Sequence, residues 1–160
     1  MVATNISSGE RCKTRYFGNV DYNEESVLVF PEGIPAFEQE KRFLALRQPQ
    51  NEPMVFLQSL LTPELCFVAL PVQAVRPGFR LNMAPEDLAA LQLDPSRQPE
   101  IGRDVLCLTL LSLVENMPPT VNLLAPIIVN IKTLNGRQAI QMDSPYSHRE
   151  ALPLREAACS

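Results

Sequence analysis

The 160-residue chain contains few groups that could carry acid–base or nucleophilic chemistry. Its one histidine, His148, is the only imidazole available as a general base, and it lies in a polar segment near the C-terminus, where an exposed side chain is the better interpretation. The glycines are too dispersed to form a phosphate-binding loop. The four cysteines are far apart and contain no C-x-x-C pair, so we expect no enzymatic activity, no metal and no cofactor. These cysteines are Cys12, Cys66, Cys107 and Cys159.

Side chains suited to protein recognition gather in the C-terminal third. Tyrosine and arginine are frequent interface anchors, and a rigid hairpin presents its side chains at little entropic cost. Pro126 cannot donate a ladder hydrogen bond, so the residues before it are expected to form a bulge or strand entry near a sheet edge. We therefore predict a partner-binding surface in this region. Its candidate residues are Asn122, Leu123, Leu124, Asn130, Lys132, Tyr146, Ser147 and Arg149.

A structural role is the alternative for the same residues. Leu123 and Leu124 would then enter the core, Tyr146 would cover it, and Arg149 would pair with Asp143. A second candidate surface is acidic, and its alternative is an ordinary solvated loop face. The acidic candidates are Glu24, Glu25, Glu32, Glu38 and Glu40.

A hairpin is predicted at Asn135-Gly136, because both residues tolerate the positive φ of a two-residue type I′ turn. The register that follows from this turn buries one side of the hairpin and exposes the other. The buried pairs would be Ile131 with Ile140 and Val129 with Met142, and the exposed pairs Asn130 with Gln141 and Lys132 with Ala139.

Many short strands are indicated by alternating segments between prolines and turn residues. Val105–Val114 is apolar at both parities, which is typical of a central strand covered on both faces. Ala84–Leu93 is expected to be the one short helix, with Pro85 in its first turn. Together these features predict a mainly β fold, a small closed or half-closed antiparallel β-barrel-like domain. Other expected strands are 42–46, 54–60 and 65–70, which look like a meander. A first hairpin of 16–22 and 27–30 is expected about a turn at 23–26, with Val20 facing Val29 if these four residues form the loop.

Composition bounds the class of protein. An apolar content of 46% favours one globular domain, expected at residues 14–154, with a flexible extension at 1–13 and a flexible tail at 155–160. With 14 Lys and Arg against 18 Asp and Glu, the net charge is −4 and direct nucleic-acid binding is not expected. The longest apolar run is too short to span a membrane, and the cysteine pattern fits a reducing compartment. We expect a cytoplasmic protein without membrane contact.

Several blocks of the sequence resemble the flagellar assembly factor family FliW. They are RYFG at 15–18, FPEGIPAFE at 30–38, KRF at 41–43, FLQSL at 56–60, PELCFV at 63–68, TVNLLAPIIVN at 120–130 with the following IKT-x-NG, and D-x-x-YS-x-R at 143–149. They occur in the order of the family and cover nearly the whole chain, which is far more specific than one motif. Two positions differ from the usual pattern, because the family commonly has glycine at Ala36 and His-Pro in place of Glu150-Ala151.

The resemblance implies a barrel-like fold and a non-enzymatic partner switch. Members of the family bind the translational repressor CsrA, which relieves repression of flagellin mRNA, and they also bind flagellin. CsrA and flagellin are therefore the expected partners. Two alternatives remain open at this point: a dedicated flagellin chaperone without control of CsrA, and a barrel that binds a small ligand.

Overall fold

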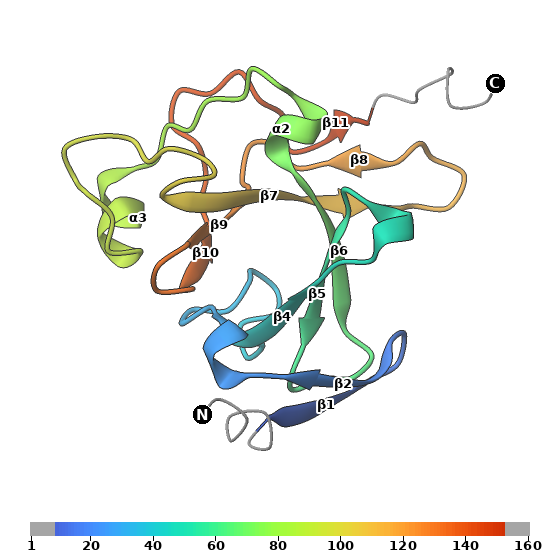
Figure 1. Cartoon of the computed structure of the whole chain (residues 1–160). Helices are drawn as coiled ribbons and strands as arrows, with labels where there is room; N and C mark the ends of the chain where they lie inside the picture. The colour runs from blue at the N-terminus through green and yellow to red at the C-terminus, as the bar shows by residue number, and fades with distance from the viewer. Residues whose placement is uncertain (1–8, 153–160) are drawn as a thin grey trace.

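The computed structural model describes residues 9–152 and is mainly β, with two short α-helices. A two-stranded hairpin, β1 (Glu10–Thr14) and β2 (Gly18–Tyr22), lies below a nine-stranded sheet in Figure 1. The strands of the larger sheet are β3 (Leu28–Val29), β4 (Arg42–Leu46), β5 (Val55–Ser59), β6 (Cys66–Pro71), β7 (Val105–Ser112), β8 (Thr120–Val121), β9 (Ile127–Asn130), β10 (Gly136–Gln138) and β11 (Glu150–Ala151).

The expected antiparallel meander is confirmed in β4, β5 and β6, which pair in sequence order. Strand β7 follows next to β6 and also pairs with β9 and β8, so it is central, as its two apolar faces indicate. The last two residues of the predicted apolar strand are not part of β7. Leu113 and Val114 lie beyond the strand and are 71% and 60% exposed.

The expected helix is confirmed as α3 (Pro85–Ala90), and its first turn contains Pro85 and two acidic residues. Leu88 and Leu91 are buried against the sheet. A second helix, α2 (Val72–Val75), follows β6 directly, so the expectation of one helix was too low. Short 3-10 turns occupy η1 (Glu24–Ser26) and η2 (Pro49–Asn51).

The sheet does not close into a barrel. Its path runs from β10 through β9, β7, β6, β5 and β4 to β3, and the two edge strands meet only through an isolated parallel bridge between Val29 and Asn135. The Val29 N–H donates to the Leu134 carbonyl over 3.0 Å, and the chain then leaves β10 at Pro31. Proline has no N–H to continue a ladder, so the curved sheet of Figure 1 stays open at this seam.

The C-terminal hairpin exists, but its predicted turn and register were wrong. Val129 pairs with Gly136 instead of Met142, and residues 131–135 form a wider loop in which Leu134 has a φ of 61°. Asn130 organises this loop, because its Oδ1 accepts the backbone N–H groups of Lys132 and Thr133.

The predicted faces of this hairpin were therefore also wrong. Ile140 is 66% exposed and Met142 39% exposed, whereas Ala139 and Gln141 are buried. Gly136 does not adopt a positive φ. A Cβ there would lie 2.7 Å from the Phe30 ring, so this glycine permits close packing instead of a tight turn.

The first hairpin was also assigned to the wrong strands. Val20 of β2 lies opposite Cys12 of β1, while β3 pairs with β4. The segment expected to be the turn is the 3-10 helix η1. Strand β1 therefore includes the last four residues of the expected N-terminal extension, 10–13; residues 1–8 and the expected tail at 155–160 lie outside the described residues.

Candidate interaction surfaces

The loop before β9 divides its residues between the core and the surface. Leu123 is fully buried in the main hydrophobic cluster, so its side chain packs and cannot meet a partner in this conformation. The Asn122 side chain accepts the Ala125 N–H over 2.9 Å, an Asx turn that shapes the loop before Pro126. Leu124 stays half-buried. The sequence alone did not separate the roles of these three neighbours.

Asn130 and Lys132 were predicted on the same solvent-exposed face of the hairpin, but their surroundings differ. Asn130 is 5% exposed, and its Nδ2 donates to the Leu91 carbonyl over 2.7 Å, which ties β9 to the end of α3. Lys132 is exposed at the rim of a hollow of about 200 Å³ near Asp94 and Asp104. Only Lys132 is thus available to a partner.

Tyr146 is held in place from several sides. Its ring stacks on Phe79 with centroids 4.5 Å apart, the Arg76 guanidinium lies 5.5 Å from its centroid, and its hydroxyl accepts the Arg80 N–H over 3.0 Å. The ring remains half-buried, so the structural role considered for it applies. A side chain fixed in this way loses little conformational entropy when a partner covers its exposed part.

Ser147 and Arg149 follow Tyr146 and connect it to the loop before β9. The Ser147 carbonyl accepts the N–H groups of Leu123 and Leu124, at 3.0 and 3.2 Å, and its hydroxyl accepts the Arg149 N–H. Arg149 is exposed, and within residues 9–152 it forms no ion pair with Asp143. Glu150, at one departure from the family pattern, instead pairs with Arg76 and lies in β11.

These contacts assemble what we call the C-terminal surface: Leu124, Ile140, Met142, Tyr146 and Arg149. The Gln141 N–H donates to the Leu124 carbonyl over 2.8 Å, which brings the strand after β10 beside the loop. Met142 and Tyr146 also line one hollow of about 360 Å³. Sequence reasoning missed Ile140 and Met142 as surface residues because it set the hairpin register from the wrong turn.

The acidic candidates do not form one patch. Glu40 is 7% exposed and accepts hydrogen bonds from the hydroxyls of Ser59 and Thr62, a structural role. Glu24 forms an ion pair with Arg42. Glu25 is exposed in η1. Glu32 and Glu38 remain, and both line a groove elsewhere.

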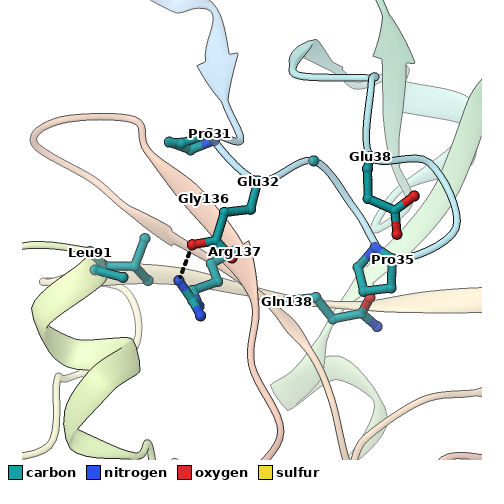
Figure 2. Close-up of a pocket in the computed structure, with 10 residues that line it drawn as sticks. Pro31, Glu32, Pro35, Glu38, Leu91, Gly136, Arg137 and Gln138 are labelled. Atoms are coloured by element: carbon teal, nitrogen blue, oxygen red, sulfur yellow. Dashed lines mark hydrogen bonds and ion pairs between the residues drawn. The ribbon is translucent and has the colours of Figure 1, made fainter.

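That groove, which we call the seam groove, lies where the sheet fails to close. It has a volume of about 270 Å³ and runs between the loop of residues 31–38, the end of α3 at Leu91, and β10. Figure 2 shows Arg137 of β10 reaching toward Glu32 across it. The Arg137 guanidinium forms ion pairs with Glu32 over 3.0 Å and with Asp87 of α3 over 2.7 Å. It therefore joins β10, the loop of residues 31–38 and α3.

Backbone geometry fixes the loop of the seam groove. Gly33 has a φ of 70°, and a Cβ there would lie 2.5 Å from the backbone of Glu38, so only glycine fits. Ala36 has a φ of 75°, a conformation that favours glycine and that explains the glycine usual in the family. The Glu38 carboxylate accepts the Ala36 N–H over 3.0 Å and holds this turn.

The described side chains offer little to a metal or a nucleophilic mechanism. Burial raises the pKa of Cys66 to about 11 and that of Cys107 to about 12, so both thiols stay protonated at neutral pH. Within residues 9–152 no group of three or more His, Cys, Asp or Glu side chains is arranged to hold a metal ion. The helices of this part of the chain include none long and apolar enough to cross a membrane.

Comparison with known proteins agrees with this geometry. The family model described as FliW protein matches residues 11–152. A flagellar assembly factor FliW of Syntrophomonas wolfei is 36% identical, covering 84% of this chain and 83% of its own, and that of Bacillus subtilis is 31% identical, covering 87% and 94%. A crystal structure of the flagellar assembly factor FliW superposes with a TM-score of 0.77 at 29% identity, covering 92% of this chain and 99% of the other. The chain therefore belongs to the FliW family of flagellar assembly factors.

Proposed function

We propose that this chain is a non-enzymatic flagellar assembly factor of the cytoplasm that binds CsrA, relieves repression of flagellin mRNA, and also binds flagellin. The observation that carries the proposal is the family match, which spans residues 11–152. Binding of flagellin would withdraw the protein from CsrA. A molecule of this protein bound to flagellin would not be free to bind CsrA, so flagellin lowers the concentration of protein available to CsrA. Flagellin would then feed back on its own translation.

Charge supports the choice of partner. CsrA, the partner that the family resemblance implies, is a basic RNA-binding protein. This chain carries a net charge of −4. Complementary charge speeds association and disfavours wrong partners more than it adds affinity. We therefore expect association with CsrA to slow as ionic strength rises.

The C-terminal surface is the proposed contact region. Tyr146 and Arg149 would anchor the partner, with Leu124 as the apolar contact beside them. Ser147 would hold the loop through its carbonyl. The further candidates Asn122 and Lys132 would contribute at the margin, whereas Leu123 and Asn130 would support the surface from inside the protein.

Titration calorimetry tests the proposal directly. The purified chain is titrated into CsrA of the same organism, then into CsrA bound to flagellin leader RNA, and finally with flagellin present. Binding that displaces RNA and is suppressed by flagellin is the expected result. Binding to flagellin alone would instead indicate a dedicated flagellin chaperone, and binding to neither folded partner would refute both.

Leu124→Asp tests the surface. Leu124 is half-buried in the C-terminal surface, so we expect little change in the thermal transition. We expect CsrA binding to weaken by about tenfold, which is typical of an interface residue that contributes more than about 1 kcal/mol to binding. Leu61→Asp is the matched control, since Leu61 is 65% exposed between β5 and β6. Equal binding by both variants would place the interface elsewhere.

A further inference from the structure

The seam groove marks the place where a strand is missing from the curved sheet. The two sheet edges touch at Val29 and Asn135 and then separate, because the chain after Phe30 turns away at Pro31 and Gly33. Loop 31–38 therefore lies opposite β10 without pairing to it, and Figure 2 shows the loop and the strand on either side of the opening. A segment placed between them would continue the sheet across the seam.

The free edge of β10 carries unused main-chain groups. The N–H of Asn130 donates to the Asn135 carbonyl, and that of Ala139 donates to the Pro126 carbonyl, so alternate residues from 135 onward face β9. The residues between them face the opening. At its two ends this edge is already used, because Leu134 accepts from Val29 and Met142 donates to Asn82.

Two positions in the middle of this edge are free: Gln138, the last residue of β10, and Ile140, two residues beyond it. Within residues 9–152 no hydrogen bond involves the N–H or carbonyl of either one. Gly136 has the same orientation but lies under the Phe30 ring. An added antiparallel strand could exchange a pair of hydrogen bonds with each of the two free residues, which lie about 7 Å apart at roughly 3.4 Å per residue.

The charge of the seam groove selects the kind of segment. Glu32 and Glu38 line the groove with two negative charges, and Arg137 lines it with one positive charge that pairs with Glu32 and with Asp87 of α3. Glu38 lies on the loop side with only the Ala36 N–H as its hydrogen-bond partner within the described residues. The Lys41 ammonium adds a second positive charge at the Pro31 carbonyl, over 2.8 Å. Within the described residues Glu38 is the lining carboxylate without a cationic partner, so a basic side chain suits the position opposite it.

We propose that the seam groove binds an extended peptide segment carrying a basic residue, which adds to the free edge of β10 and completes the sheet across the seam. Main-chain bonds to Gln138 and Ile140 give the affinity, and Glu38 selects the basic side chain. The inference goes beyond the proposed function, since it assigns a second binding surface and holds whichever protein supplies the segment.

The test uses the full chain labelled with nitrogen-15 and three five-residue peptides. The first alternates lysine and valine, the second alternates glutamate and valine, and the third is the lysine peptide N-methylated at alternate residues. We expect the lysine peptide to shift the amide signals of Gln138 and Ile140, the glutamate peptide to shift neither, and N-methylation to weaken binding about tenfold. Equal binding of the three peptides, or shifts confined to other residues, would overturn the proposal.

Two variants separate charge from main-chain pairing. Glu38→Gln keeps an oxygen for the Ala36 N–H but removes the charge, so the lysine peptide should bind about two- to fivefold more weakly and with less dependence on salt. Glu25→Gln, in exposed η1, is the control and should change nothing. If both variants bind equally, Glu38 does not select the peptide and the proposal fails.

Gln138→Pro removes a main-chain donor that no described residue uses, so the fold should tolerate it while peptide binding falls. Gln138→Ala controls for the lost side-chain hydrogen bond to the Ala125 carbonyl. An unchanged spectrum outside β10 confirms the fold, and unchanged peptide binding by Gln138→Pro would refute pairing at β10. The outcome for CsrA is read separately by calorimetry. If the Gln138→Pro variant loses peptide binding but still binds CsrA, the proposed function is retained. If it binds the peptide but no longer binds CsrA, the proposal for the seam groove is retained.

Discussion

Gly33→Ala should destabilise the fold more than any other single methyl group added to a glycine in the described part of the chain. The left-handed φ of 70° costs an L-residue about 1–2 kcal/mol. The new Cβ would also lie 2.5 Å from the Cα and carbonyl oxygen of Glu38, and relieving such an overlap costs a further 1–3 kcal/mol or so. The sum is about 2–5 kcal/mol.

Gly18→Ala is the matched control because Gly18 has nearly the same φ, 68°, and nothing within 4 Å of the added Cβ. Its expected cost is the strain alone, about 1–2 kcal/mol. Urea unfolding at fixed pH measures the free energy of unfolding of both variants. The difference between them gives the cost of the overlap between the added Cβ at residue 33 and the Glu38 backbone. Equal free energies of unfolding for the two variants would refute the conclusion that backbone contact at Glu38 requires a glycine.

Three other substitutions give distinct readouts. Ala36→Gly relieves the φ of 75° at the cost of some chain entropy, so the free energy of unfolding should rise by about 0.5–1 kcal/mol in urea titration; a loss would contradict strain at this position. Leu123→Ala should lower it by about 2–5 kcal/mol because the side chain is fully buried, and a loss below about 1 kcal/mol would contradict its core role. A hydrogen bond from Arg97 and another from the Glu100 N–H lower the pKa of Asp104, so its stabilisation is present above the unfolded pKa near 3.9 and is lost as pH falls through the lower folded value. Thermal unfolding should therefore separate Asp104→Asn from the parent at pH 7 and bring the two together at pH 2, and a constant difference would contradict this linkage.

The parts of the fold that the sequence predicted correctly are those with a local signal. The two apolar parities of β7 indicate a covered strand without reference to its partners. Pro85 with acidic residues marks the start of α3 in the same way. The meander of β4, β5 and β6 follows from short connections that leave neighbouring strands few other ways to pair.

The prediction failed where a distant residue decides the local conformation. Asn135-Gly136 has the composition of a type I′ turn, yet the Asn130 side chain holds a wider loop. It donates to the carbonyl of Leu91, directly after α3, and accepts the N–H groups of Lys132 and Thr133. Close packing under the Phe30 ring, not a tight turn, is the reason for glycine at 136. Two physical causes can thus put glycine at one position, and only the contacts distinguish them. The same shift of register reversed the exposure of Ile140 and Met142, which belong to the C-terminal surface.

The sequence by itself determined the family, the mainly β class and the central strand, because these depend on composition and on patterns within a few residues. Tertiary structure decided which residues face outward and where the sheet stays open. Those outcomes depend on pairs far apart in the chain, such as Arg137 with Glu32 and Val29 with Leu134. A long-range contact forms only when the intervening chain folds to bring its two ends together, so short-range periodicity carries no record of it.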